Sequence, residues 1–430
     1  MKDGRYTRSR SLLERVEQVI PLGSQTFSKS RVVYPSGAAP LFLTHGKGAH
    51  VWDVDGNEYV DFVNGLLPVI LGYDDPDVIE AVSQQLARGV TFSLPTPLEV
   101  ELAELLREII PCAEMVRFGK NGSDATSAAI RIARAATGRD RVAVCGYHGW
   151  QDWYIGATTR SKGIPQAVRE LTHIFPYNNL ESLQLLLESH PDAFAAVMME
   201  AMNVEEPRPG YLQGVCDLAH EHGALFVLDE IITGFRFHIG GAQSLYGVTP
   251  DLATFGKSMA NGFPISALVG RARYMKEMEE IFFSSTFGGE TLSLAASIAT
   301  IRKMQREPVH ATLDRLGQSI IDTTRSNLKR HGLERSIVIS GKPSWSLLQF
   351  KDTPTATAAE VKSLYLQEII ARGILTAGSH NLCYAHTGED LERLARAQDE
   401  TMGVVREAIE RADIAARLAG PPIQPVFRVR

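Results

Sequence analysis

The sequence is informative first through what it lacks. It contains only four cysteines, Cys112, Cys145, Cys216 and Cys383, which are far apart and form no Cys-x-x-Cys pair. This spacing argues against a zinc site, a redox couple or a disulfide framework, so we expect reduced cysteines, mostly in the core. No apolar run is long enough to span a membrane, and the Arg-rich residues 1–16 do not resemble a secretory signal. We therefore expect a cytoplasmic protein with no membrane partner.

The chain also lacks any strongly basic or acidic block. It carries 44 Lys and Arg against 50 Asp and Glu, a formal net charge of −6 at pH 7. Because no concentrated positive field is available to a polyanion, we expect no nucleic-acid partner. The 430 residues are 44% hydrophobic and 22% charged and show no internal repeat, which indicates a globular protein with a large core and two or three domains.

The alternation of strand-like and helix-like segments divides the chain into three regions. Residues 1–65 contain two strand-like runs between Ala49 and Phe62, and the turn signal Asp55-Gly56 between them predicts a β-hairpin. Residues 306–430 carry long amphipathic helix patterns around a few short strands. We expect the N-terminal segment and this region to form one smaller α+β domain. The helix patterns cover residues 309–329, 358–372 and 391–416.

Residues 66–305 alternate between helix patterns and short apolar runs, which is typical of an α/β domain with a mostly parallel sheet covered on both faces. The segment Thr96-Pro97-Leu98-Glu99 predicts a helix start, because it combines an N-cap, a proline at the first helical position and a glutamate three residues after the cap. Brief apolar runs predict buried parallel strands at residues 141–145, 195–200 and 224–229. A reactive site is expected where the carboxyl ends of these strands open.

The segment Asn121-Gly122-Ser123-Asp124-Ala125 begins a small-residue helix pattern just after a predicted strand. Free backbone amides at the start of this helix, the Ser123 hydroxyl and the helix dipole could hold a phosphate group. A simple Ser/Asp helix cap is the alternative, and it is the simpler interpretation of the segment taken alone. The segment alone leaves both interpretations open.

Two charged residues follow the later strands. Asp229 ends an apolar strand, where a carboxylate would keep a basic ring nitrogen of a cofactor protonated, because each charge stabilises the other. Metal binding and a solvated strand end are the alternatives for this residue taken alone. Lys257 lies in a turn flanked by glycine and serine, where an exposed surface lysine is the simplest interpretation.

The order of these features is more specific than any one of them. A phosphate-binding helix start, the aromatic turn Tyr147-His148-Gly149-Trp150, a strand-end aspartate and then a lysine together resemble the class III (subgroup II) aminotransferases of fold type I, which use pyridoxal 5′-phosphate (PLP). The segment Asp229–Arg236 with the lysine turn is a specific signature, and the resemblance runs from Ile20 to Asp390. It implies a large domain with a seven-stranded, mostly parallel sheet and a smaller α+β domain.

The resemblance also implies a role for each matching residue. Lys257 would hold PLP as an internal aldimine and then transfer protons, while Asp229 would pair with the pyridine nitrogen. Tyr147 would stack on one face of the ring and Ile231 would lie against the other. The remaining implied cofactor contacts are Gly122 and Ser123 at the phosphate, His148 in the aromatic turn, and Asn203 at the ring hydroxyl.

Thr286, in the segment Ser285-Thr286-Phe287-Gly288-Gly289, matches the family threonine that reaches a phosphate in the neighbouring subunit. The resemblance therefore implies a homodimer with shared active sites. The other partners would be a small-molecule amino donor and a carbonyl acceptor, and we expect no metal ion.

A P-loop ATPase is the main alternative from another class. Residues 224–230 imitate an acidic Walker B strand, and Gly256-Lys257-Ser258 imitates the end of a Walker A loop. However, Asp251 stands where the first loop glycine is needed, and the Gly-Lys-Ser run follows the acidic strand instead of preceding it. The order of the motifs therefore favours the aminotransferase.

Within the family, the chain resembles glutamate-1-semialdehyde 2,1-aminomutases, but the substrate region departs from them. Gly65-Leu66-Leu67-Pro68 stands where those enzymes carry Ser-Trp-Gly-Pro, so a pocket tryptophan is missing. Residues 375–386 form a shorter segment that lacks a glutamate found near their substrate. We therefore predict ping-pong transfer from an amino-acid donor to a small aldehyde or ketone, such as a keto-sugar, with the aminomutase reaction as the alternative.

Other substrate contacts are less sharply defined by the sequence. Arg31 aligns with the family arginine that binds a substrate carboxylate, and the aromatic run Trp150–Gly156 could stack on a ring or sugar or pack as a lid. The candidate substrate residues are Arg31, Leu66, Trp150 and the strand-end Glu200.

Overall fold

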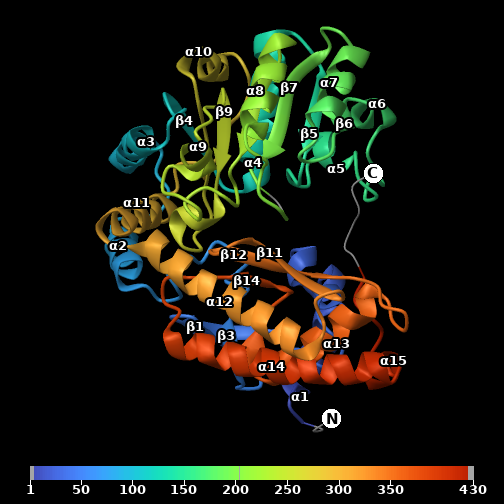
Figure 1. Cartoon of the computed structure of the whole chain (residues 1–430). Coiled ribbons are helices and arrows are strands. Elements are labelled where there is room, and N and C mark those ends of the chain that lie inside the picture. Colours follow the sequence, from blue (N-terminus) through green and yellow to red (C-terminus); the bar gives the residue numbers. More distant parts are fainter. Residues whose placement is uncertain (1–3, 203, 425–430) are drawn as a thin grey trace. The chain divides into compact units, whose positions relative to one another are not determined.

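The chain forms two compact units, seen in a computed structural model that describes residues 4–202 and 204–424 (Figure 1). Within this range, unit 1 takes the residues up to Asp75 and those from Ala311 onward, and unit 2 takes Pro76–His310. Unit 1 therefore combines N-terminal and C-terminal segments, and unit 2 is continuous in sequence.

The first boundary between the two units lies after Asp75, later in the chain than the boundary near residue 65 that the sequence predicts. Residues 66–75 stay with unit 1 because Tyr73 is tied to it in two ways. Its backbone pairs with that of Gly48, and its hydroxyl donates a hydrogen bond of 2.7 Å to Asp61. These contacts join residues distant in sequence, so local patterns do not reveal them.

Unit 2 is built around the seven-stranded, mostly parallel sheet that the resemblance implies. Strands β9, β8, β7, β5 and β6 run parallel, and β10 is antiparallel to both β9 and the edge strand β4. The three strands predicted from apolar runs are confirmed as β5, β7 and β8. The bounds are β4 (Met115–Gly119), β5 (Arg141–Cys145), β6 (Thr172–Ile174), β7 (Phe194–Glu200), β8 (Leu225–Asp229), β9 (Leu252–Phe255) and β10 (Ser266–Gly270).

Helices surround this sheet, and the predicted start of α3 is confirmed. Thr96 is its N-cap, and Glu99 closes a capping box by accepting the Thr96 amide at 2.9 Å. The helices of unit 2 are α2 (Pro76–Leu86), α3 (Pro97–Ile109), α4 (Gly122–Thr137), α5 (Asp152–Ile155), α6 (Gln166–Arg169), α7 (Leu180–Ser189), α8 (Tyr211–Glu221), α9 (Gly241–Tyr246), the 3-10 turns η4 (Lys257–Ala260) and η5 (Lys276–Glu279), α10 (Ala272–Met275) and α11 (Thr291–Arg306).

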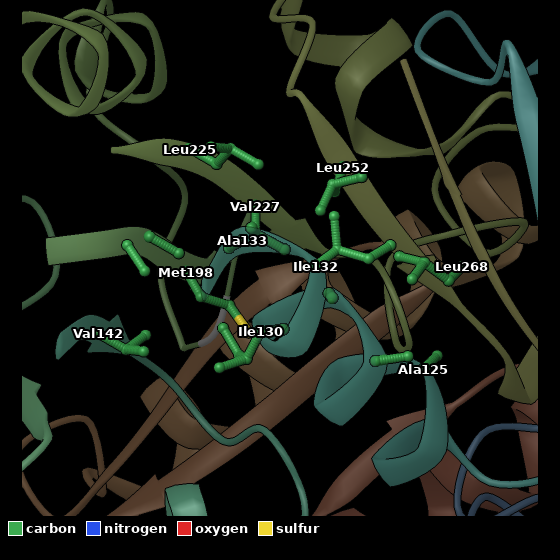
Figure 2. Close-up of a cluster of buried hydrophobic side chains, with 14 of the residues drawn as sticks. Ala125, Ile130, Ile132, Ala133, Val142, Met198, Leu225, Val227, Leu252 and Leu268 are labelled. Carbon is green, nitrogen blue, oxygen red and sulfur yellow. The ribbon is translucent and has the colours of Figure 1, made fainter. Parts of the chain in front are cut away.

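A hydrophobic core fills the space between α4 and the central strands. Ile130 and Ala133 of α4 lie in one buried cluster with Met198 of β7 and Val227 of β8 (Figure 2). Neighbouring residues of a strand point to opposite faces of the sheet, yet every residue of β7 is buried. Both faces of the sheet are therefore covered, as expected for buried parallel strands.

Unit 1 contains two smaller sheets, and the predicted hairpin is confirmed as the antiparallel pair of β2 and β3. One sheet has the order β1-β2-β3-β13 and the other the order β11-β12-β14. The strands are β1 (Leu43–Lys47), β2 (His50–Asp53), β3 (Glu58–Asp61), β11 (Ile337–Lys342), β12 (Trp345–Phe350), β13 (Ile374–Leu375) and β14 (Ser379–Asn381). The helices are α1 (Thr7–Val16), the turns η1 (Pro21–Gly23), η2 (Phe27–Lys29) and η3 (Arg31–Val33), then α12 (Val309–His331), α13 (Ala358–Ala371), α14 (Gly388–Glu410) and α15 (Ile414–Arg417).

The prediction of one helix over residues 391–416 is wrong at both ends. Thr387 caps α14 in a capping box with Asp390, so the helix begins earlier. It ends at Glu410 because Ala412 has a φ of +53°, which an α-helix does not allow, and α15 follows separately. In the part of the chain that the structure describes, no helix is long and apolar enough to cross a membrane.

A buried chain of hydrogen bonds links α12 and α14 of unit 1 to the sheet that contains β12 and β14. His380 of β14 contacts the Ser346 hydroxyl at 2.9 Å and the side-chain amide nitrogen of Gln398 at 3.1 Å, and Thr324 donates to the Gln398 oxygen at 3.0 Å. Because an amide nitrogen only donates, His380 Nε2 accepts, and Nδ1 carries the proton toward Ser346. This arrangement requires a neutral imidazole. Burial and the nearby His386 ring lower the pKa of His380 to about 4.

We predict that this histidine makes unit 1 sensitive to acid. His380 stays neutral in the folded protein while its unfolded form binds a proton below pH 6.5. The free energy of unfolding should therefore fall by up to roughly 3 kcal/mol as the pH drops through this window, and the loss should level off below about pH 4. Urea denaturation at about pH 7 and about pH 5 measures the difference.

The variant His380→Gln should be less stable at neutral pH but should lose less stability on acidification than the natural protein. His45→Gln, at an exposed position, is the matched control and should keep the natural pH dependence. Equal losses in His380→Gln and the natural protein would show that another group causes the acid sensitivity.

Candidate active site

Three polar residues lie in one row at or next to the carboxyl ends of the central parallel strands of unit 2. In the sheet register, Asp229 of β8 pairs with Glu200 of β7 on one side and with Thr254 of β9 on the other. Asp229 lies two residues after Val227, which faces α4 in the core, so the row points to the same face of the sheet. The carboxyl ends of these strands therefore form a polar edge beside an apolar core.

Asp229 is buried in this edge, with 3% of its surface exposed. One carboxylate oxygen accepts the Ile231 amide at 3.0 Å and the Thr254 hydroxyl at 3.1 Å. The other lies 2.8 Å from Nδ1 of His148. Asp229 is thus not the solvated strand end considered as an alternative. Thr254 was not predicted as a site residue, although a polar residue within the apolar run Leu252–Phe255 could have indicated a buried polar contact.

His148 is held as firmly as the aspartate that it contacts. It is 1% exposed, its ring lies 5.2 Å from that of Tyr154 in an edge arrangement, and its backbone carbonyl accepts the Thr126 hydroxyl at 2.8 Å. Its second nitrogen, Nε2, is buried without a hydrogen-bond partner among the described residues. The ring is therefore fixed with Nδ1 toward Asp229.

The start of α4 leaves its amides and one hydroxyl available at this edge. Asn121 caps the helix together with Asp124, which accepts the Asn121 amide at 2.7 Å. Ser123 is therefore not the cap, and its hydroxyl instead accepts the Trp150 amide at 3.3 Å. A side chain at Gly122 would come within 3.1 Å of Ile231, so glycine keeps this helix start accessible.

Lys257 follows β9 at the start of the four-residue turn η4, with a φ of +33°. Lys257 is half-buried and not exposed as a surface lysine would be. Burial lowers the pKa of Lys257, Arg236 lowers it further, and the charges of Glu200 and Asp229 oppose this shift. Because η4 is a single short turn, Gly256-Lys257-Ser258 does not lead into the long helix that follows a P-loop.

Glu200 is the second buried carboxyl of the edge. Its Oε2 accepts the Tyr147 amide at 3.0 Å. Burial raises the pKa of Glu200, and the charge of Asp229 raises it further. A side chain at Gly146 would collide with this carboxyl group, so the turn after β5 can close over Glu200 only with glycine there.

The aromatic run after β5 is divided between surface and core. Tyr147 and Trp150 are 43% and 65% exposed, whereas Trp153 and Tyr154 are buried in the core of unit 2. Trp153 also donates to the Ser127 hydroxyl at 3.0 Å. The second half of the run therefore packs, and the first half leaves two aromatic rings available to a ligand.

The structure does not bring all of the expected residues into this cluster. Arg31 and Leu66 belong to unit 1, where Arg31 is exposed and forms an ion pair with Glu17. Thr286 lies in unit 2 in an exposed segment before α11. Asn203 lies outside the described residues. The residues that gather at the polar edge are Gly122, Ser123, Tyr147, His148, Trp150, Glu200, Asp229, Ile231 and Lys257.

The chain is similar in sequence to proteins of known family. The sequence pattern of the family described as aminotransferase class-III matches residues 33–386. The 3-aminobutyryl-CoA aminotransferase of Cloacimonas acidaminovorans is 37% identical over 94% of this chain and 99% of its own. The glutamate-1-semialdehyde 2,1-aminomutase of Heliobacterium modesticaldum is 35% identical over 95% and 99% of the two chains.

A solved structure agrees with the sequence relatives. The FumI protein of Sphingopyxis sp. MTA144, in its PLP internal aldimine form, superimposes with a TM-score of 0.88 and 30% identity over 97% of this chain and 99% of its own. The family match covers most of the chain, and the relatives match along nearly their whole length. The chain therefore belongs to the class-III aminotransferases, PLP-dependent enzymes of fold type I.

Proposed function

We propose that the protein is a cytoplasmic aminotransferase that transfers an amino group from an amino-acid donor to a small aldehyde or ketone in a ping-pong reaction. The observation that carries this proposal is the placement of a buried acid, Asp229, at the end of β8 and of an amine of lowered pKa, Lys257, just after the neighbouring strand β9. When bound, PLP supplies an electron-withdrawing ring and carries the amino group from one half-reaction to the next. None of the four cysteines forms a disulfide, in keeping with a reducing compartment.

The residues at the polar edge fit this cofactor. The accessible amides at Gly122 and Ser123, at the positive end of α4, suit a phosphate group. Asp229 accepts hydrogen bonds from the Ile231 amide and the Thr254 hydroxyl and lies beside Nδ1 of His148, so it is held where it would face the ring nitrogen. Tyr147 and Ile231 would lie against the two faces of the ring. Nε2 of His148 has no hydrogen-bond partner among the described residues, so it could form a hydrogen bond with a bound ligand.

Lys257 would act first as the anchor of the cofactor and then as a base. Burial lowers the pKa of its amine, which increases the fraction of the neutral form at physiological pH. A neutral amine can attack a carbonyl carbon and, once released, can take a proton from the substrate carbon and return it. The same side chain therefore serves binding and proton transfer.

Lys257→Ala should lose essentially all turnover, because it removes both the anchor and the base. Reduction of the natural holoenzyme with borohydride should attach a pyridoxyl group to the peptide that contains residue 257, as measured by mass spectrometry. Lys276→Ala, a lysine change in η5 of the same unit, should keep both turnover and the label. A label on any other lysine would refute the assignment.

The choice between transfer and isomerisation depends on residues around the substrate. Leu66 stands where the resemblance places a pocket tryptophan, so one group that an aminomutase would offer its substrate is missing. A relative named for 3-aminobutyryl-CoA adds 3-amino acyl thioesters to the candidate donors and the corresponding 3-oxo compounds to the candidate acceptors, beside keto-sugars. We therefore favour transfer between two molecules.

The half-reactions distinguish the two possibilities. We expect one or more amino acids or 3-amino acyl thioesters to discharge the PLP form of the enzyme, as seen in its visible absorption, and a carbonyl compound to restore it. An aminomutase needs no external donor. Rapid isomerisation of glutamate 1-semialdehyde, with no donor able to discharge the cofactor, would overturn the proposal.

We also propose a homodimer in which Thr286 of one subunit completes the site of the other. Thr286 is exposed between two exposed phenylalanines, Phe282 and Phe287, which are 80% and 56% exposed. Leu94, 78% exposed, adds to the apolar surface of unit 2. Large apolar side chains exposed in this way favour burial against a partner.

Thr286→Ala should weaken PLP binding by about tenfold or more, the loss expected for a hydrogen bond to a charged group. Mixing Thr286→Ala subunits with Lys257→Ala subunits tests whether the site is shared. Hybrid dimers should regain a single site with natural affinity and turnover, because the two changes then fall in the other site. If hybrids bind PLP no better than Thr286→Ala alone, each site uses its own threonine.

A further inference from the structure

A mostly buried ion pair joins the starts of two helices of unit 2. Lys120 lies between β4 and the N-cap of α4, and Glu290 is the N-cap of α11. Nζ of Lys120 is 2.9 Å from Oε2 of Glu290, and the two side chains are 15% and 13% exposed. The same ammonium group donates to the Ser293 hydroxyl at 3.2 Å. The pair therefore connects helix starts that are 170 residues apart in the sequence.

On one side, the ion pair holds the start of α4, where the proposed phosphate contacts lie. The backbone amides of Lys120 and Asn121 both donate to Asp124, at 3.0 Å and 2.7 Å. The backbone of Lys120 is thus part of the helix cap, and Gly122 and Ser123 follow directly. Because these residues are covalently and hydrogen-bonded neighbours, a shift of Lys120 would also shift the amides of Gly122 and Ser123.

On the other side, the ion pair holds the loop that carries Thr286. Two turns follow each other in residues 285–290, closed by backbone hydrogen bonds of 3.0 Å and 3.2 Å, and the second of these is donated by the amide of Glu290. Thr286 is exposed and precedes Glu290 within this short loop. The position of Glu290 therefore determines where the loop, and with it Thr286, is held.

The loop is also fixed to the strand that leads into Lys120. Arg117 of β4 donates to the carbonyl oxygen of Phe283, just before the loop, at 3.0 Å. A side chain at Gly288 would come within 3.2 Å of the Phe118 carbonyl oxygen, so the loop lies close against β4. The loop is thus tied to β4 at its beginning and to Lys120 at its end.

Stability alone gives little reason for a lysine at this position. A cation at the N-terminus of α11 opposes the helix dipole, and the cost of removing two charges from water offsets much of the attraction between them. Glu290 already caps α11 by accepting the Leu292 amide at 2.7 Å and the Ser293 amide at 3.2 Å. What Lys120 adds is a defined position of the start of α4 relative to the loop.

We propose that Lys120 is a positioning residue for two phosphate contacts. Through Glu290 it fixes the start of α4, which contacts the cofactor of its own subunit, relative to the loop of Thr286, which contacts the cofactor of the partner subunit. This inference deepens the proposed function and rests on it for the phosphate group and for the shared site. Lys120 acts through the helix start and the loop, because its own ammonium group is engaged by Glu290 and Ser293.

A charge-free pair tests this role in the full-length protein after PLP has been dialysed away. Lys120→Met combined with Glu290→Gln keeps a capping side chain and leaves no unpaired charge, so the double variant should melt near the natural temperature. Its affinity for PLP should fall by about tenfold or more, as expected when hydrogen bonds to a charged group are misplaced. Its affinity for pyridoxal, which lacks the phosphate, should change little.

Natural affinity for PLP in the double variant, or equal losses for PLP and pyridoxal, would overturn the proposal. Glu290→Gln alone is a milder change, because the lysine keeps its contact with Ser293. It should show a selective loss of PLP affinity of the same kind, and an unchanged ratio of the two affinities would also count against the role of the pair.

Lys303→Met is the matched control. Lys303 lies near the other end of α11 and pairs with Asp77 of α2 at 2.9 Å, with 9% of its side chain exposed. Asp77 keeps its second partner, Arg306, in this variant. The ratio of the pyridoxal and PLP affinities should stay natural. A selective loss as large as in the double variant would show that any disturbance of α11 has this effect, and the proposal would fail.

Mixed dimers test whether the pair acts on both sites. A dimer of one double-variant subunit and one natural subunit has one site with the altered start of α4 and one with the altered Thr286 loop, so both sites should bind PLP weakly. A dimer of one Ser123→Ala subunit and one natural subunit should keep one site of natural affinity. If the first hybrid also keeps such a site, the pair acts on one contact only and the proposal fails.

Failure of the proposed function is recognised by different measurements. The borohydride label on Lys257 tests the anchor of the cofactor, and the hybrids of Thr286→Ala with Lys257→Ala test the shared site. Both use subunits with an intact Lys120–Glu290 pair. If both succeed while the double variant binds PLP normally, only the role of Lys120 is refuted.

Discussion

A buried negative charge at the end of β8 determines most of the arrangement around it. An uncompensated carboxylate at 3% exposure would destabilise the fold by several kcal/mol, so Asp229 needs donors on every side. These come from its own loop through Ile231, from β9 through Thr254 and from the turn after β5 through His148. Because each donor belongs to a different segment, satisfying one carboxylate fixes three segments relative to one another.

Small residues let these segments approach. Gly122 avoids a close contact with Ile231, and a side chain at Gly146 would collide with Glu200. At Gly149, with a φ of +108°, an added side chain would collide with Ser123. The start of α4, the aromatic turn and the loop after β8 can therefore converge on one edge of the sheet. The close packing that orders the polar groups also excludes water, which strengthens the electrostatic effects among them.

The sequence revealed the features that are encoded locally. The strand Arg141–Cys145, the capped start of α3 and the β2–β3 hairpin follow from apolar runs, a capping box and an Asp-Gly turn, each contained within a few residues. Features set by distant partners were missed or misplaced. Thr254 gains its role only beside Asp229, Arg31 meets Glu17, and Tyr73 holds residues 66–75 in unit 1 through Gly48. Such contacts depend on the assembled fold, and the residues next to each position in the sequence do not identify its partner.

The roles of the two strand-end acids depend on the register between β7 and β8. Side chains alternate along a strand, so a slip of one residue would turn Glu200 to the opposite face, away from Asp229 and Lys257. The packing of Met198 against Val227 and α4 in the core opposes such a slip. The register two residues earlier in each strand therefore places the two acids side by side at the carboxyl ends of β7 and β8.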